Sequence, residues 1–287
     1  MQTFVTFERE PRELAATIRD AIDAGTIGER VWFYSNYTCN LACRYCLTSS
    51  SPSVTPRELD TATIVALARD AVRLGFGSFG ITGGEPFLRR DMPELIEMLA
   101  QMLPVVVLTN GTLFTDRFVR ERLSPLAGLS VAFQVSLDAA DAVVDDRYRG
   151  AGTHARAVAG LERLATYGLR RRIGTTIDDD GDGDLATLQQ FALAHGVSDD
   201  DHVIRPIIAR GAAVALGIGS EAGAADVPPE LTITLDGAFW SPASPTIRNG
   251  RLDVGERLTQ TLRPLDVAAK AMLRFAQTLP QRTFRVT

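Results

Sequence analysis

The sequence predicts an α/β fold built on a parallel sheet, and three observations lead to this expectation. The chain has 287 residues, 45% of them hydrophobic, which is enough to bury a normal globular core. Short β-rich runs alternate with stretches whose apolar residues have helical spacing, in units of roughly 25–35 residues. Six such units follow one another, and strands that are buried on both faces and separated by helices indicate a parallel sheet.

Each unit can be placed along the chain. The expected strands lie at 31–36, 79–82, 105–109, 131–137, 172–177 and 203–208. The expected helices lie at 59–74, 92–103, 115–123, 153–167 and 185–195. Glycines end three of these helices, at Gly75, Gly168 and Gly196, and Pro104 breaks another. Asp91 is expected to be an N-cap, because its side chain can accept a hydrogen bond from a free amide at a helix start.

Beyond residue 210 this alternation ends, which predicts a separate C-terminal part. Residues 211–229 are rich in Ala and Gly and are expected to form a loop, whereas 231–235 could form one more strand. Residues 254–279 have helical spacing in parts, with Pro264 as a break. The expected parts are an N-terminal segment at 1–29, a core at 30–210 and a C-terminal extension at 211–287.

Charge and hydropathy exclude some classes of protein. The formal net charge is −5 at pH 7, which argues against a surface dedicated to nucleic acid. The first residues are charged and amphipathic, without the features of a signal peptide, and no apolar run is long enough to span a membrane. We therefore expect a cytoplasmic protein with neither a nucleic acid nor a membrane as its partner.

Three cysteines, Cys39, Cys43 and Cys46, share one short loop and are the only cysteines in the chain. An odd number at such tight spacing is no disulfide framework, so a metal site is the better interpretation. The loop follows the first expected strand, and loops after strands lie at the face of an α/β fold where active sites are built. Three thiolates can bind three corners of an iron–sulfur cubane, and without a fourth cysteine one iron must take another ligand.

Structural zinc is the alternative for this loop. It requires four protein ligands, and only three cysteines are available. The histidines that would have to complete the site are His154, His195 and His202, which lie on or beside later elements. His195 is better explained as the C-terminal residue of a helix that Gly196 ends.

The run from Tyr37 to Cys46, YTCNLACRYC, resembles the signature of the radical S-adenosylmethionine (SAM) superfamily. It resembles most the branch that contains the SPASM and Twitch enzymes, with the aromatic Tyr45 before the last cysteine. The resemblance covers about 30–210 and implies a partial (β/α)6 TIM-like barrel. It also implies that SAM chelates the open iron of a [4Fe–4S] cluster, and that one electron then cleaves SAM to a 5′-deoxyadenosyl radical.

The same resemblance extends to a set of residues around SAM. Gly83 begins a run that resembles the GGEP motif, which grips the amino group of SAM; without that context, two glycines simply form a turn that allows close backbone approach. Ser136 would contact the carboxylate or ribose, and the guanidinium of Arg149 would pair with the carboxylate, with the nearby Arg147 as the alternative. The residues assigned to SAM in this way are Tyr45, Gly83, Gly84, Glu85, Pro86, Asn110, Ser136, Asp138, Arg149, Thr175 and Arg205. Ordinary turns, strand ends and solvated arginines are the alternatives for the weaker members of this set.

Two segments depart from known patterns. SPASM and Twitch enzymes carry further cysteines after the barrel, and this chain has none, although 232–242 resembles the start of such a domain. We therefore expect 211–287 to be a degenerate extension without an auxiliary cluster. The Asp-rich run at 178–184 resembles the opening of a calcium loop, but Gln189 stands where that loop needs a bidentate Glu, which favours a solvated turn.

The functional expectation is an enzyme that abstracts hydrogen from a small molecule or a natural-product precursor, with Cys39, Cys43 and Cys46 as catalytic cluster ligands. A reductase with flavodoxin, or a ferredoxin, would donate the electron. One alternative is modification of a ribosomally synthesised peptide. Many enzymes of that kind carry a winged peptide-recognition domain, and the first thirty residues are too short for one, which argues against this alternative. Another is an iron–sulfur protein that only carries or senses electrons, which would have no use for a SAM pocket. The substrate, the reaction after hydrogen abstraction and the fate of SAM do not follow from the sequence.

Overall fold

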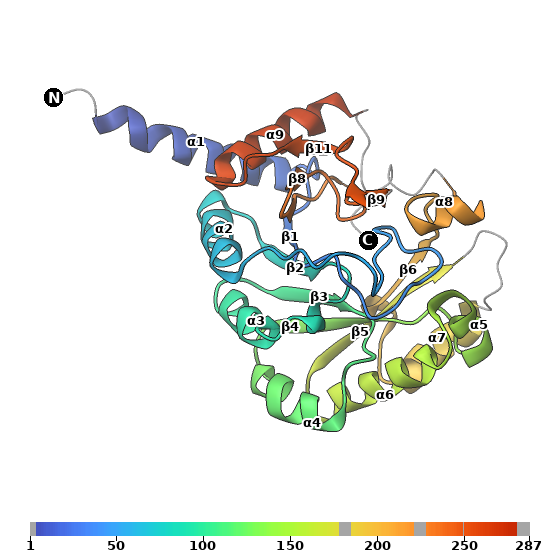
Figure 1. The fold of residues 1–287 in the computed structure, drawn as a ribbon. Helices are drawn as coiled ribbons and strands as arrows, with labels where there is room; N and C mark the ends of the chain where they lie inside the picture. The colour runs from blue at the N-terminus through green and yellow to red at the C-terminus, as the bar shows by residue number, and fades with distance from the viewer. Residues whose placement is uncertain (1–3, 178–184, 221–227, 249, 280–287) are drawn as a thin grey trace.

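The computed structural model describes residues 4–177, 185–220, 228–248 and 250–279 (Figure 1). Its main sheet has the strand order β11-β8-β7-β1-β2-β3-β4-β5-β6, and a separate hairpin pairs β9 with β10. The strands are β1 (Arg30–Tyr34), β2 (Ser78–Thr82), β3 (Val105–Thr109), β4 (Val131–Ser136), β5 (Arg170–Ile177), β6 (His202–Pro206), β7 (Thr232–Thr234), β8 (Gly237–Phe239), β9 (Ile247–Arg248), β10 (Arg251–Leu252) and β11 (Arg257–Thr259).

The strands from β1 to β6 are all parallel, each paired with the next. The expectation of a parallel α/β sheet with six successive strands is therefore confirmed. In the part of the chain that the structure describes the barrel is partial and not closed, because β6 and β11 stand at the two ends of the sheet.

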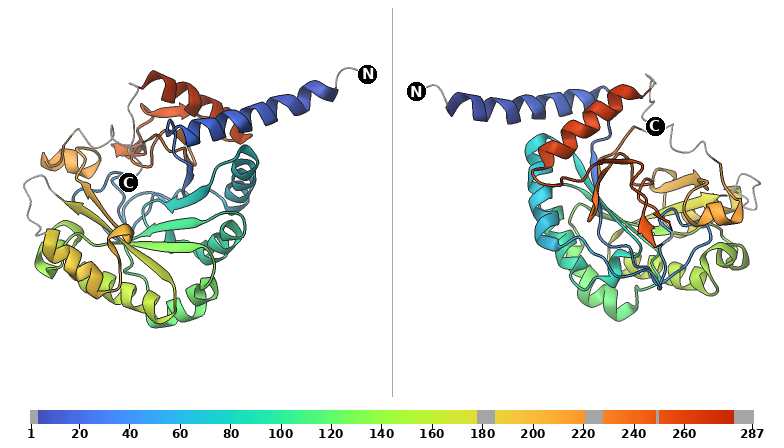
Figure 2. Two further views of the ribbon diagram at one scale, coloured as in Figure 1. Left: turned by 180° about the vertical axis from the view of Figure 1, so that it is seen from behind. Right: turned by 45° about the horizontal axis from the view of Figure 1, so that its top comes forward.

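The α-helices are α1 (Phe4–Asp23), α2 (Thr61–Leu74), α3 (Met92–Ala100), α4 (Asp116–Phe118), α5 (Ala142–Arg149), α6 (Thr153–Thr166), α7 (Leu185–Ala194), α8 (Ala212–Leu216) and α9 (Leu265–Thr278). Helices α2, α3, α4, α6 and α7 cover the outer side of the curved sheet (Figure 1). Short irregular helices complete the list: η1 (Pro86–Leu88), η2 (Val119–Leu123), η3 (Ser124–Leu126) and η4 (Asp199–Asp201). The views in Figure 2 show that α1 projects beyond the body, with α9 lying against its inner part.

Alternation along the strands separates the core from the barrel interior. Val31 and Phe33 of β1 belong to the apolar core, as do their counterparts on the next strands. Trp32 lies between them and points to the other face. A Cβ atom on Gly80 would lie 2.2 Å from the Trp32 ring, and one on Gly174 would lie 2.7 Å from the Gln134 amide. These glycines therefore give space to the large side chains that fill the interior.

Most expected helix boundaries agree with the structure, and the exceptions have physical reasons. Asp60 caps α2 by accepting a hydrogen bond from the Thr63 amide, and Gly75 ends the helix with a φ of 90°. Asp91 does occupy the position before α3, but its carboxylate makes no capping bond. It binds the guanidinium of Arg89 instead, at 2.9 and 3.1 Å.

The helix expected at 115–123 is a short α4 followed by a π-helical turn, η2. Three α-helices, α1, α5 and α8, are not among the expected elements, and α8 begins the stretch at 211–229 that was expected to be a loop. The stretch at 254–279 divides into β11 and α9, since Pro264 stands at the start of α9 and separates the two.

The C-terminal part continues the sheet of the core beyond β1. β7 runs parallel to β1, and β8 and β11 follow it as antiparallel strands. The strand expected at 231–235 is β7. We propose that residues 211–287 form one C-terminal extension, which adds three strands, β7, β8 and β11, to the main sheet.

No helix in the described part of the chain is long and apolar enough to cross a membrane.

Candidate active site

The cysteine loop leaves the carboxyl end of β1 and is fastened along its length by backbone hydrogen bonds. The Tyr37 amide donates to the Arg57 carbonyl at 3.3 Å, and the Cys39 amide donates to Ser51 at 3.4 Å. Within the loop, the Cys46 amide donates to the carbonyl of Cys43 at 3.1 Å. The loop therefore has a fixed path over the carboxyl ends of the strands.

The C-terminal extension and the chain after β6 hold the other end of this loop. The Ala212 amide donates to the Cys46 carbonyl at 2.9 Å. The hydroxyl of Thr246 donates to the Leu47 carbonyl at 2.9 Å, and the Ile247 amide donates to Thr48 at 2.9 Å. Three consecutive carbonyls are thus satisfied by residues that are remote in sequence.

The three cysteines are free thiols close to one another. Cys39 is buried, whereas Cys43 and Cys46 are partly buried. Burial is the main cause that raises the pKa of Cys39 to about 12 and that of Cys43 to about 11. The charges of Cys43 and Cys46 add to the rise at Cys39.

The arrangement suits a cluster better than a single metal ion. Among the residues that the structure describes, no three His, Cys, Asp or Glu side chains are placed to hold one metal ion. A structural zinc would need such convergence, since its bonds to sulfur are about 2.3 Å long. A cubane binds each thiolate through a different iron atom, so one loop with three thiols, in a chain without a fourth cysteine, supplies the donor set of a [4Fe–4S] cluster with one open iron.

The glycine pair after β2 packs directly under the cysteine loop. The Gly84 amide donates to the Asn36 carbonyl at 2.9 Å, and the Glu85 amide donates to Thr38 at 2.9 Å. A Cβ atom on Gly84 would lie 2.2 Å from the Thr38 oxygen, and one on Gly83 would meet Asn36 at 2.5 Å. Only glycine permits this contact between two backbones.

Glu85 is fully buried, and protein donors occupy its carboxylate. The carboxylate accepts hydrogen bonds from the Phe87 amide at 3.1 Å, the Thr109 hydroxyl at 2.8 Å and the Asn110 amide at 2.8 Å. Burial nevertheless raises the pKa of Glu85. Pro86 is buried at the start of η1. The carboxylate thus fastens the ends of β2 and β3 together, and the glycine backbone is the part of the motif nearest the cysteine loop.

Asn110 follows β3 and lies beside the first cysteine. Its side-chain amide donates to the Cys39 sulfur at 3.8 Å and to the Asn40 side chain at 2.9 Å. The expected association of Asn110 with the site thus takes the form of a contact with the cysteine loop.

Tyr45, Asp138 and Arg149 form one buried network behind Cys43. The Tyr45 hydroxyl donates to Asp138 and accepts from Arg149, the latter at 2.5 Å. The side chains of Arg149 and Asp138 are each 5% exposed and form an ion pair at 3.5 Å. Asp145, which was not expected at the site, accepts a hydrogen bond from the Asp138 amide at 2.8 Å. Arg149 is therefore held by internal partners, although its Nε atom has none.

The remaining expected residues differ in what they present to the interior. Ser136 is half-buried at the end of β4. Thr175 is fully buried, and its hydroxyl donates to the Leu137 carbonyl at 2.7 Å and contacts His202 at 2.9 Å. Arg205 lies on β6, where loss of surrounding water lowers the pKa of its guanidinium. The charged groups nearest to it belong to Tyr45, Asp138 and Tyr34, which lie on the side of the cysteine loop.

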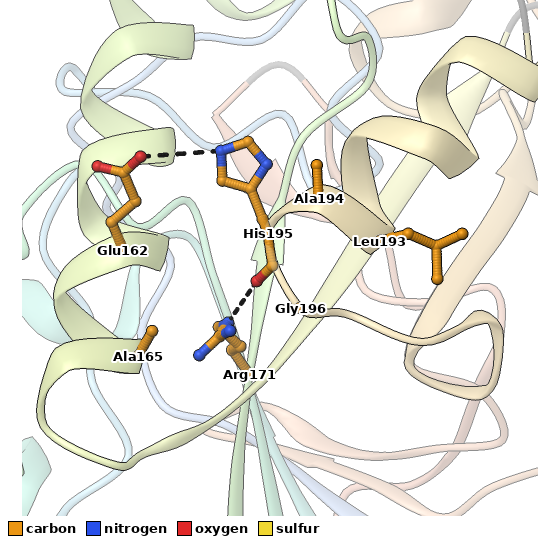
Figure 3. A pocket seen from close by; sticks show the side chains of 7 residues that line it. All are labelled: Glu162, Ala165, Arg171, Leu193, Ala194, His195 and Gly196. Atoms are coloured by element: carbon orange, nitrogen blue, oxygen red, sulfur yellow. Dashed lines mark hydrogen bonds and ion pairs between the residues drawn. The ribbon is translucent and has the colours of Figure 1, made fainter.

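Two hollows in the described surface lie away from the cysteine loop. One, of about 470 Å³, lies between α6 and α7 and is lined by Glu162, Arg171 and His195 (Figure 3). The other, of about 390 Å³, is lined by residues at the amino ends of the strands, such as Arg30, Ser78 and Arg170. Neither contains a residue expected at the site. The Asp-rich run at 178–184 lies outside the described residues.

Fold and loop together define a class: an open α/β barrel protein whose reactive groups gather at the carboxyl ends of the parallel strands. The model of the Radical SAM superfamily matches residues 33–191, more than half of the chain. The chain therefore belongs to the radical SAM superfamily, whose enzymes use a [4Fe–4S] cluster and SAM.

Comparison with known proteins gives relatives of more than one kind. The mycofactocin maturase MftC of Mycobacterium ulcerans is 37% identical over 164 residues, which are 56% of this chain and 43% of that protein. A probable GTP 3′,8-cyclase of Archaeoglobus fulgidus is 37% identical over 134 residues, 46% of this chain and 43% of that protein. The matched region thus spans less than half of either relative.

A solved structure shares the fold at lower identity. Streptococcus suis SuiB, in its crystal structure bound to precursor peptide SuiA, superimposes with a TM-score of 0.55 at 17% identity. The match covers 69% of this chain and 43% of that chain.

Proposed function

We propose that this chain cleaves SAM reductively at a [4Fe–4S] cluster bound by Cys39, Cys43 and Cys46, and that the radical abstracts hydrogen from an organic substrate. The observation that carries the proposal is the loop of three neighbouring thiols without a fourth cysteine. When bound, the cluster supplies one electron to SAM and an iron with an open coordination position.

Some residues of the chain would contact SAM directly, and others would hold those residues in position. The backbone of Gly83 and Gly84, beside the cysteine loop, is suited to receive the amino group of SAM. Ser136 and Arg205 offer a hydroxyl and a guanidinium toward the interior, for the carboxylate, ribose or adenine.

The buried members of the expected set would act differently. Glu85, Asp138 and Thr175 have their polar groups engaged with protein partners, as does Arg149 except at its Nε atom, and Tyr45 belongs to the same network. In this proposal they fix the elements around SAM, and their contact with it is indirect.

For the substrate, we propose a small molecule or a natural-product precursor. A ribosomally made peptide is the second candidate, because one relative is named a maturase and SuiB, which shares the fold, is seen with a precursor peptide. The relative named as a GTP 3′,8-cyclase supports a nucleotide-sized molecule instead. A reductase with flavodoxin, or a ferredoxin, is the proposed electron donor in either case.

The test begins with anaerobic reconstitution of iron and sulfide, followed by dithionite and SAM, and 5′-deoxyadenosine is then quantified. We expect product above the level of a Cys43→Ala control, even without substrate. Product at the control level would remove the catalytic proposal and leave an electron carrier. Adding peptides encoded beside this gene, or nucleoside triphosphates, tests the two substrate classes, since the correct one should increase product formation.

A further inference from the structure

Three polar side chains form a closed ring beside the first cysteine of the loop. The Asn110 amide donates to the Asn40 side-chain oxygen at 2.9 Å, and the Asn40 amide donates to the Thr112 hydroxyl at 2.9 Å. The Thr112 hydroxyl closes the ring by donating to the Asn110 side-chain oxygen at 2.6 Å. Cys39 lies next to this ring, and both Cys39 and Asn110 are buried.

The ring fixes which way the Asn110 amide faces. Its side-chain oxygen also accepts a hydrogen bond from the backbone amide of Thr112 at 2.9 Å, and a backbone N–H can only donate. The NH2 group must therefore be on the opposite side, where one hydrogen serves Asn40 and the other points to the Cys39 sulfur at 3.8 Å. The orientation thus follows from the donors around it.

A donor aimed at a cluster-ligating sulfur changes the energy of the added electron. Hydrogen bonds to the sulfurs and the exposure of the cluster are among the factors that set the reduction potential of iron–sulfur clusters. The reduced cluster carries one more negative charge than the oxidised one, so an N–H donor stabilises the reduced form more. Burial of Asn110 and Cys39 strengthens this effect, because water screens it little.

We propose that Asn110 is a positioning residue that raises the reduction potential of the cluster by donating to the Cys39 thiolate, with Asn40 and Thr112 holding its amide in place. This inference rests on the proposed function, because it requires Cys39 to be a cluster ligand. The single electron comes from an external reductant, and no bond within the protein is made or broken.

The test is a potentiometric titration of the reconstituted protein, followed by electron paramagnetic resonance of the reduced cluster. Asn110→Leu has a similar shape without donors, and Asn110→Ala removes the group entirely. Both variants should have a more negative midpoint potential, by roughly a tenfold change in the reduced-to-oxidised ratio, or about 59 mV for one electron. Ser53→Ala, an exposed position outside the ring, is the control and should keep the wild-type potential.

The outcomes separate this inference from the proposed function. If the wild-type protein binds no cluster, the proposed function fails and the inference with it. If the cluster forms and the Asn110 variants keep the wild-type potential, the inference alone is overturned.

If neither Asn110 variant binds iron, the contact can be tested in wild-type protein whose asparagine side-chain amides are labelled with 15N. A weak nitrogen coupling to the reduced cluster is expected in pulsed spectra of this sample. Its absence would contradict the contact.

Discussion

The two ends of the parallel strands use polar residues in different ways. At the carboxyl ends, Glu85 and Asn110 are buried and joined to backbone amides of neighbouring loops. At the amino ends, Arg30 pairs with Glu230 at 3.4 Å and Arg170 pairs with Asp201 at 2.9 Å. The side chains of these amino-end pairs are 19–67% exposed.

The difference teaches where a substitution should affect chemistry and where it should affect stability alone. Buried hydrogen bonds to loops fix the position of the cysteines, and their loss displaces groups around the site. Ion pairs that are partly open to water are worth about 0–1 kcal/mol each, and these two hold no reactive group. In α/β barrels generally, the carboxyl ends of the strands build the active site and the amino ends contribute to stability.

The largest expected effect is at the cysteines. Cys46→Ala should abolish cluster binding and 5′-deoxyadenosine formation, because the variant keeps only two of the three thiolates that hold the cubane. Iron content and visible absorption after reconstitution measure the loss. Ser53→Ala, an exposed position in the same loop, is the control and should reconstitute normally. Full activity in the Cys46 variant would contradict the assignment of the ligands.

Gly84→Ala should destabilise the fold and displace the cysteine loop together. Its Cβ would lie 2.2 Å from the Thr38 carbonyl oxygen, a backbone atom that cannot rotate away. We expect a loss of about 3 kcal/mol in the free energy of unfolding, measured by urea denaturation, with lower iron content as well. Gly255→Ala adds the same methyl group at a position without a backbone clash, so its stability should stay close to wild type.

Arg205→Met should weaken SAM binding with little change in stability. The Arg205 guanidinium faces the interior, and no hydrogen bond or ion pair to another described residue is found for it. Loss of one charged contact should raise the Kd for SAM about tenfold, or 1.4 kcal/mol, by calorimetry on the cluster-loaded protein. Arg251→Met removes the same charge from an exposed position on β10 and is the control. An unchanged Kd in the Arg205 variant would assign that residue to the substrate instead.

The smallest effect is a pH dependence at the amino ends. Burial raises the pKa of Glu230 above the ordinary value of a glutamate carboxyl, about 4.5, so folding favours the protonated carboxyl. The associated stability is complete below that value and is lost as the pH rises through the raised pKa.

Glu230→Gln should therefore gain stability relative to wild type from pH 4 to pH 7, since Gln can still accept from Trp32. Urea denaturation across this range measures the difference, and iron content should stay unchanged. A difference that falls with pH would contradict the expected sign.

Local patterns are sufficient to predict the strands of the core and most of their helices. Buried β-branched runs such as 105–109 identify the strands, and Gly75 ends α2 where expected. Helix α1 is missed because its sequence, with charges and a proline inside the first turns, lacks the apolar run of a core helix. The π-turn of η2 depends on packing around it and leaves no pattern in the chain.

The candidate site is predictable in its members and not in their partners. The cysteine spacing and the glycine pair can be recognised because each is a contiguous motif. The bonds from Asn110 to Cys39 and Asn40 span 71 and 70 residues, and only the folded chain brings their ends together. The hydrogen bond from Arg149 to Tyr45 spans 104 residues and could not be predicted for the same reason. The resemblance had assigned Arg149 to the SAM carboxylate.

The hydrogen bonds that fasten the cysteine loop from the C-terminal extension have a consequence for biosynthesis. Thr246 and Ile247 satisfy the carbonyls that follow Cys46, about two hundred residues earlier in the chain. A nascent chain still attached to the ribosome thus exposes its thiols with this loop only partly fastened. Iron that reached the chain before these residues emerged would meet an open loop, whereas iron that reached the folded chain would have to enter one that is already fastened.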